Sequence, residues 1–184
     1  GKETGYRADL HSRDWTLECY VKAIATNLTG YLVDLPGGPP PPAPQRAFAC
    51  RMWLSNSVPV VTFYTVGGYP YTVSGLAIPT NAWVHIAGVW NHGLNSLALY
   101  VDGIFIQEQR VYEECVTSRT YSHTNNPTIG RSPDTSFVNQ VYLDEVRIWN
   151  LARTADEIES NRTVMIEQDA AGLVGYYRFD DGGE

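Results

Sequence analysis

Short runs with strand signals recur along this chain, and the clearest of them alternates hydrophobic and polar residues with a period of two. In WTLECYVKA (Trp15–Ala23), apolar residues occupy the odd positions and mostly polar residues the even ones. Successive side chains of a β-strand point to opposite faces, so this pattern indicates a strand with one buried face. Similar runs recur between turn residues, at 30–36, 46–54, 58–66, 71–78, 83–91, 96–109, 127–131, 141–150 and 173–179. The chain is therefore predicted to be all-β, a two-layer antiparallel β-sandwich.

The connections between these runs carry their own signals. Asp102-Gly103 separates two apolar runs and supplies the residues that a tight two-residue hairpin turn requires. The stretch GGPPPPAPQ at 37–45 is rich in proline, which cannot donate ladder hydrogen bonds, and is predicted to be an exposed, stiff loop. A proline-rich docking motif is the alternative for this stretch. Residues 113–126 are polar and are predicted to form another long loop.

One short helix is predicted near the C-terminus, in TADEIESNR at 154–162. Thr154 is followed three residues later by Glu157, which is the spacing of a capping box at a helix start. We expect Leu151 and Ile158 to cover the end of the sandwich.

Composition and charge narrow the class of protein. A chain of 184 residues with 43% hydrophobic residues can bury one substantial core, so residues 1–184 are expected to form a single domain. The chain begins at Gly1, and we expect it to be a piece of a longer polypeptide with neighbouring domains. The net charge of −7, with two lysines and no basic cluster, argues against nucleic acid as a partner. No apolar run approaches the ~20 residues of a membrane-spanning helix, so membrane insertion is not expected.

The cysteines give a weaker signal. Cys19 and Cys50 alternate with apolar residues and are expected to lie in the core, and a disulfide between them requires neighbouring strands. Cys115 follows two glutamates, which disfavour its thiolate.

The strand VYLDEVRIWN at 141–150 raises a question about one carboxylate. Strict alternation places Tyr142, Asp144, Val146 and Ile148 on one face, and the two aliphatic residues indicate that this face is buried. A carboxylate on a core face is costly unless it has a partner. Pairing of Asp144 with Arg131 or Arg178, or access to water at an edge of the sandwich, is one explanation. A bound cation is the other.

Three segments together resemble a known family. They are AWVHIAGVWNHGLNSLALYVDG, IGRSPDTSFVNQVYLDEVRIWNLARTADEI and GLVGYYRFDDG. Their motifs, in this order, resemble those of laminin-G-like, concanavalin-A-like lectin and glucanase jelly-roll domains of the pentraxin-like superfamily. The resemblance runs from about residue 15 to residue 182 and implies a jelly-roll fold. It says less about activity, because such folds carry many functions.

The resemblance also implies a structural calcium site. In this family the aspartate that opens the DEVRIW-like strand is a typical ligand, and here that residue is Asp144. Calcium takes six to eight oxygen ligands, so other groups have to contribute. Asp34 and Asp9 are candidates for adding charge to the site.

Enzyme signatures are absent from the sequence. Related glucanases use a Glu-x-Asp-x-x-Glu strand that points carboxylates into one groove, and no such motif occurs here. The four histidines form no His-Glu-x-x-His arrangement, and no Gly-x-Ser-x-Gly turn is present. His85 lies among apolar neighbours and is expected to be a core histidine. We therefore do not expect this protein to be an enzyme.

With no enzyme signature in the sequence, the aromatic residues indicate binding as the expected function. Tyr64, Tyr69 and Tyr71 surround a Gly67-Gly68 turn and are candidates for an exposed platform that stacks on sugar rings, although they could instead shield sheet edges. Four tryptophans lie in strong strands and are expected in the core or sheet, namely Trp15, Trp83, Trp90 and Trp149. The expected function is a non-catalytic, extracellular or cell-surface recognition module that binds a glycan or a cell-surface protein. The alternative is a structural or assembly domain of a surface or fibre protein.

Overall fold

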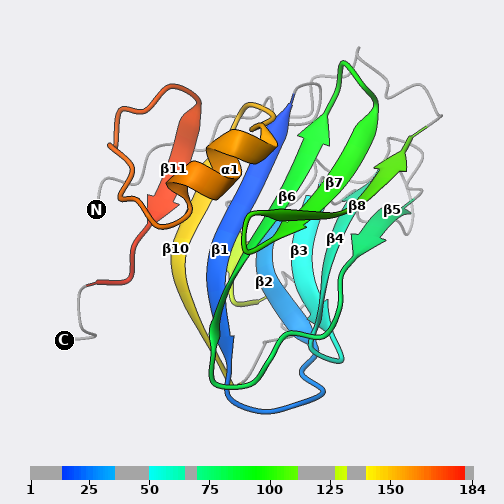
Figure 1. Cartoon of the computed structure of the whole chain (residues 1–184), viewed down its shortest axis with the longest axis vertical. Coiled ribbons are helices and arrows are strands. Elements are labelled where there is room, and N and C mark those ends of the chain that lie inside the picture. Colours follow the sequence, from blue (N-terminus) through cyan, green and yellow to red (C-terminus); the bar gives the residue numbers. More distant parts are fainter. Residues whose placement is uncertain (1–13, 36–49, 65–69, 112–126, 132–139, 181–184) are drawn as a thin grey trace, which may run out of the picture.

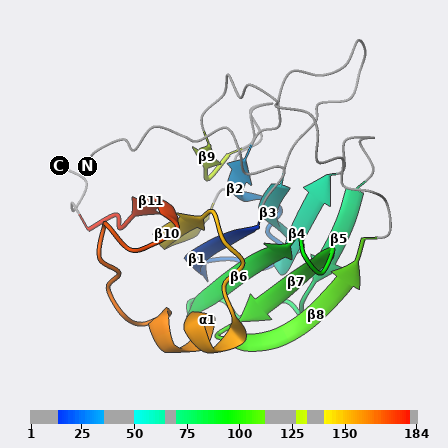
Figure 2. The ribbon, with the colours of Figure 1, turned by 90° about the horizontal axis from the view of Figure 1, so that it is seen from above.

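Two antiparallel β-sheets lie face to face in the computed structural model, which describes residues 14–35, 50–64, 70–111, 127–131 and 140–180 (Figures 1 and 2). The six-stranded sheet has the order β11-β10-β1-β6-β7-β8, with bounds β1 Trp15–Ala23, β6 Trp83–Asn91, β7 Ser96–Val101, β8 Ile104–Arg110, β10 Val141–Trp149 and β11 Leu173–Tyr177. The five-stranded sheet has the order β5-β4-β3-β2-β9, with bounds β2 Gly30–Leu35, β3 Cys50–Ser55, β4 Val58–Tyr64, β5 Pro70–Ser74 and β9 Thr128–Ile129. The predicted all-β sandwich is confirmed. The two long loops predicted at 37–45 and 113–126 lie outside the described residues.

The core fills the space between the two sheets, as the alternation predicts. Phe63 of β4 stacks on Trp90 of β6, with ring centroids 4.3 Å apart and planes 9° apart. Nearby, the backbone of Gly88 in β6 approaches Val61 of β4 so closely that a Cβ on Gly88 would lie 2.8 Å from both Val61 methyl carbons. A side chain at residue 88 would therefore push the sheets apart.

Both described cysteines are buried, unpaired thiols. Cys19 is in β1 and Cys50 is in β3, so they belong to different sheets and their strands are not neighbours. Burial raises the pKa of the Cys19 thiol to about 12 and that of Cys50 well above its usual value. These residues act as small core side chains, and Cys115 lies outside the described residues.

The predicted hairpin is confirmed at Asp102-Gly103, between β7 and β8. Both residues have positive φ, +51° and +82°, as the tight hairpin turn requires. The Asp102 side chain also accepts a hydrogen bond of 2.9 Å from the backbone N–H of His85.

Helix α1 (Ala155–Asn161) has the predicted capping box, with Thr154 as its N-cap and Glu157 as its partner. Its position differs from the prediction, because the buried Ile158 packs against Ala87, Val89 and Ala98. These residues lie on the outer face of β6 and β7, so α1 covers a sheet face instead of the end of the sandwich (Figure 2). Two alanines on this face leave room for the helix.

Within the described part of the chain, no helix has the length and apolar character that a bilayer-spanning segment needs.

Strand β10 contains a β-bulge at Glu145, whose φ is +50°. The register against β1 shows the extra residue. Glu18 pairs with Arg147 and Tyr20 pairs with Asp144, so an advance of two residues along β1 lies opposite an advance of three along β10. A bulge of this kind re-aims side chains on either side of the extra residue.

The bulge answers the question about Asp144. Val146 and Ile148 point into the core, but Asp144 pairs with Tyr20 and lies on the outer face of the sheet. Tyr142 is 58% exposed on the same outer face. The predicted common row of Tyr142, Asp144, Val146 and Ile148 is therefore wrong, because alternation fails at an extra residue.

Candidate functional site

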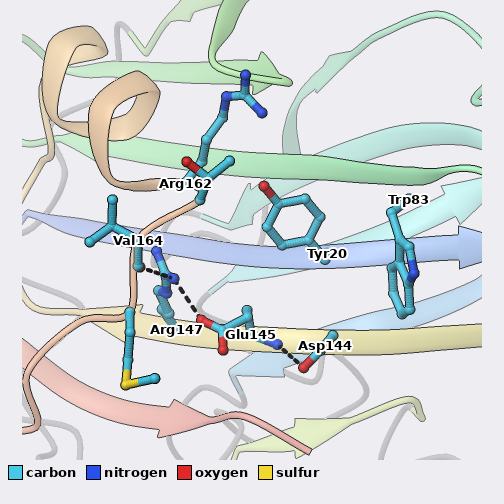
Figure 3. Close-up of a pocket in the computed structure, with 9 residues that line it drawn as sticks. Tyr20, Trp83, Asp144, Glu145, Arg147, Arg162 and Val164 are labelled. Atoms are coloured by element: carbon cyan, nitrogen blue, oxygen red, sulfur yellow. Dashed lines mark hydrogen bonds and ion pairs between the residues drawn. The ribbon is translucent and has the colours of Figure 1, made fainter.

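A pocket of about 550 Å³ opens on the outer face of the six-stranded sheet (Figure 3). Strands β1, β6 and β10 supply its floor and one side, and the segment 162–165 after α1 supplies the other side. Its volume falls within the range of about 300–1,000 Å³ typical of small-ligand sites.

Aromatic and aliphatic side chains form the walls of the pocket. Trp83, the first residue of β6, lies in the sheet, as the expectation of core or sheet allowed, and its side chain is 45% exposed. Tyr20 of β1 lies between Trp83 and the α1 side (Figure 3), with its ring centroid 5.1 Å from that of His85. Val164 and Met165 are exposed on the opposite wall. Exposed apolar side chains gathered around a polar floor are a feature of binding sites.

The floor is built around Arg147, whose side chain is almost fully buried. It donates a hydrogen bond of 2.6 Å to Glu145 and bonds of 2.9 Å to the backbone carbonyls of Asn161 and Val164. Burial alone would lower the pKa of Arg147, but Glu145 and nearby negative charges hold it above its usual value. The Tyr176 hydroxyl also donates to Glu145. The two bonds from Arg147 to backbone carbonyls hold residues 162–165, here called the α1 wall of the pocket, against the sheet.

Beneath the pocket lies Glu18, a fully buried carboxylate. Arg153 donates to its Oε1 at 2.8 Å, while His85 and Arg147 face its Oε2 at 3.4 and 3.7 Å. Burial would raise the pKa of Glu18, yet the contact with His85 and the charge of Arg153 bring it below its usual value. Arg153 also donates to the carbonyl of Glu157 in α1, so this cluster holds the helix on the sheet. His85 is buried, as expected.

Asp144 and Arg162 complete the pocket lining. Asp144 accepts a hydrogen bond of 2.8 Å from the backbone N–H of Glu145. Neither expected partner of Asp144 pairs with it within the described residues. Arg178 instead contacts Glu145 at 3.8 Å and forms an ion pair with Asp180. Arg131 makes no ion pair with any described residue.

The proposed calcium ligands do not come together. Asp34 is buried in β2 of the other sheet, with an oxygen 3.9 Å from Arg51, whereas Asp144 faces the pocket. Asp9 lies outside the described residues. No group of three His, Cys, Asp or Glu side chains converges within the part of the chain that the structure describes. These described carboxylates therefore do not fit one shared calcium site.

The tyrosine platform is also divided. Tyr71 of β5 pairs with Phe63 of β4 and packs against the core. Tyr64 follows Phe63 in β4, so its side chain points to the opposite face of the sheet. There its ring centroid lies 5.3 Å from the Arg51 guanidinium carbon. Tyr69 lies outside the described residues. Tyr64 and Tyr71 thus do not form one stacking surface.

Sequence reasoning found Asp144 but missed Tyr20, Trp83 and Arg162. Tyr20 was recognisable as a member of the polar face of β1. Trp83 lies two residues before His85, so both side chains are on the outer face of β6. Tyr20 pairs with His85 in the neighbouring strand β1, and this pairing makes Tyr20 and Trp83 neighbours on that face. That pairing is a tertiary feature, so alternation within one strand cannot reveal it.

Comparisons with known proteins agree with the architecture. The model of the concanavalin A-like lectin/glucanases superfamily matches residues 3–159. No sequence among the curated proteins matches the chain.

Solved structures with a similar fold include a presumed carbohydrate-binding protein from Bacteroides ovatus ATCC 8483, at 17% identity and a TM-score of 0.68, with 92% of this chain and 46% of that chain covered. The CBM40 of the Ruminococcus gnavus IT-sialidase, bound to alpha2,3 sialyllactose, matches at 15% identity and a TM-score of 0.63, covering 80% of this chain and 82% of that chain. A NanB sialidase of Streptococcus pneumoniae matches at 16% identity and a TM-score of 0.62, covering 80% of this chain and 24% of that chain. This chain thus spans about half the length of the first protein and about a quarter of the last. With its sandwich architecture and a family match over most of its length, the chain belongs to the concanavalin A-like lectin/glucanase superfamily.

Proposed function

We propose that this domain is a non-catalytic carbohydrate-binding module of an extracellular or cell-surface protein, and that it binds sugar in the pocket on β1, β6 and β10. The observation that carries the proposal is the half-exposed Trp83 beside Asp144 and Tyr20. A sugar ring has apolar C–H faces and a rim of hydroxyls. The indole can stack on the face while the carboxylate accepts from the hydroxyls. The carbohydrate-binding relatives named above support the same ligand class.

The state of the pocket carboxylates supports binding without catalysis. A glycosidase needs two carboxyl groups across the scissile bond, one of them with a raised pKa so that it acts as an acid. Glu145 accepts hydrogen bonds from Arg147 and from the Tyr176 hydroxyl at one oxygen, Oε2, and its Oε1 lies 3.8 Å from the Arg178 Nε. Asp144 is adjacent to it in sequence and accepts from its backbone N–H. This pair is suited to holding a ligand and to holding the floor together.

A glycan array followed by calorimetry tests the proposal. Trp83→Ala should weaken binding of any glycan found on the array at least about twofold and up to about tenfold, because a stacked aromatic contributes roughly 0.5–1.5 kcal/mol beyond the area that it buries. Phe105→Ala is the matched control, since Phe105 is 53% exposed on β8 at the far edge of the same sheet. A folded sample that binds nothing on the array, or a Trp83→Ala variant that binds as tightly as the wild type, would overturn the proposal.

Assembly through protein contacts is the second candidate, and strand β8 favours it. This edge strand exposes three consecutive apolar residues, Ile104, Phe105 and Ile106. Exposed apolar edge strands are sites where another chain can pair. Light scattering over a concentration series tests this function, and a chain that stays monomeric at every concentration would exclude it.

A further inference from the structure

The charged groups in and beneath the pocket fall into two sets. In the first, carboxylates and guanidinium groups are matched: Glu18 with Arg153, Glu145 with Arg147, and Asp180 with Arg178. This set is neutral as a whole. The second set consists of Asp144 and Arg162, which make no ion pair within the described residues. The pocket lining therefore offers a ligand one negative group and one positive group outside these pairs, and Lys22 of β1, which pairs with Trp83 of β6, lies beside the lining.

These two groups lie at opposite ends of the pocket. Figure 3 shows Asp144 near Trp83 at one end and Arg162 at the other end, with the Tyr20 ring between them. A ligand that fills the pocket thus meets an acceptor and a stacking surface first, and a cationic donor beyond Tyr20.

Arg162 is held in place by the bonds that fix its neighbours. It is the C-cap of α1, and Arg147 bonds the carbonyls of Asn161 before it and Val164 after it. The Nε of Arg162 is buried and has no hydrogen-bond partner among the described residues. The two terminal nitrogens of Arg162 are neither buried nor hydrogen-bonded within the described residues, so they are the donors that a ligand oxygen can reach. A planar guanidinium is also well suited to carboxylate and sulfate groups.

We propose that the ligand is an acidic glycan, bound in one direction. This inference rests on the proposed function. A neutral sugar unit stacks on Trp83 and donates its hydroxyls to Asp144, and the carboxylate or sulfate of a neighbouring unit binds Arg162. The opposite orientation would place the anionic group beside the Asp144 carboxylate, where like charges repel. The net charge of −7 also disfavours general adsorption of polyanions, so an acidic glycan has to be bound by this local pair of groups.

The test compares neutral glycans on an array with their sulfated and carboxylated counterparts, and then measures the strongest pair by calorimetry. We expect the acidic member of each bound pair to be favoured at least about tenfold, as for a charge-assisted hydrogen bond, with the preference falling as salt is raised. Equal binding of neutral and acidic members would overturn this inference and leave the proposed function standing. A blank array with folded protein would overturn both. The sulfated and carboxylated arms separate the two kinds of acid.

Variants of Arg162 then locate the acidic group. Arg162→Gln should reduce the acidic-to-neutral affinity ratio to about one, and Arg162→Lys should keep part of it because the charge remains but the planar fork is lost. Arg110→Gln removes the same charge from the far strand β8 and should leave the ratio unchanged. The melting temperature of each variant shows whether it is folded. A folded Arg162→Gln or Arg162→Lys variant that keeps the full wild-type preference would show that the acid binds elsewhere and would overturn the inference.

Discussion

Replacing Glu18 by glutamine removes the charge on which the α1 wall of the pocket depends. Glutamine has nearly the same shape, so the change isolates electrostatics from packing. In the wild type the carboxylate faces Arg153 at 2.8 Å, His85 at 3.4 Å and Arg147 at 3.7 Å, with no exposure to solvent. The variant leaves Arg153 as a buried cation without a carboxylate within the described residues, although it keeps its bond to the carbonyl of Glu157.

The size of the effect follows from these contacts. Removing one partner of a buried ion pair costs about 3–5 kcal/mol. Arg147 retains Glu145 and two backbone carbonyls, so its share of the loss is small and the expected cost lies at the lower end, about 3 kcal/mol. That is a large part of the roughly 5–15 kcal/mol that stabilises a typical domain. It corresponds to a fall in melting temperature of roughly 6–12 °C for a chain of this size.

The pH dependence gives a second measurement. The pKa of Glu18 is lower in the folded protein than its usual value of 4.5, because the contacts with His85 and Arg153 outweigh the opposing effect of burial. The unfolded chain therefore binds a proton more readily at this residue. The stabilisation is complete above the unfolded pKa and is lost as the pH falls through the folded pKa. Wild-type stability should decline below about pH 4.5 more steeply than that of Glu18→Gln.

Urea unfolding at neutral pH and along an acid series measures both quantities. Glu108→Gln is the matched control, because Glu108 faces Arg110 at 3.8 Å on the exposed strand β8 and should cost below about 1 kcal/mol. A Glu18→Gln variant no less stable than this control, or one with the wild-type acid profile, would refute the role assigned to the buried cluster.

Two further predictions concern packing and metal. Gly88→Ala should cost about 1–3 kcal/mol in urea unfolding, because the new Cβ would lie 2.8 Å from the Val61 methyl carbons. Gly93→Ala should cost little, because its Cβ would lie 3.5 Å from Asn91 Oδ1, an ordinary van der Waals distance; equal stability of the two variants would mean that the sheets separate easily. Calcium stays a prediction of the family resemblance: millimolar calcium after chelation should raise the melting temperature if a native-state site exists. Asp144→Asn should keep that rise, because Asp144 faces the pocket away from Asp34, and loss of the rise in the variant would locate the ion at Asp144 after all.

Local signals in the sequence were sufficient for the elements of this fold. The predicted strands Trp15–Ala23 and Trp83–Asn91 coincide with β1 and β6. The hairpin at Asp102-Gly103 and the capping box at Thr154 also lie where the sequence placed them. Apolar–polar alternation, turn residues and helix caps involve residues within a few positions of one another, so they can be recognised in the sequence alone. The family resemblance added the architecture, and the match over residues 3–159 confirmed it.

The candidate site depended on contacts between distant residues. In the segment VYLDEVRIW the aliphatic residues change parity across the adjacent Asp144-Glu145, from Val141 and Leu143 to Val146 and Ile148, and this change is the local sign of an extra residue that strict alternation overlooked. That bulge, set by the register against β1, moves Asp144 from the expected core face to the pocket. Likewise, Trp83 and Arg162 are far apart in the sequence and line one pocket only because α1 folds back onto the sheet. By itself, therefore, the sequence determined which residues form strands, turns and the helix, because these preferences are local. Only the tertiary structure decided which side chains share a surface, because strand pairing and helix docking join residues that no local pattern relates.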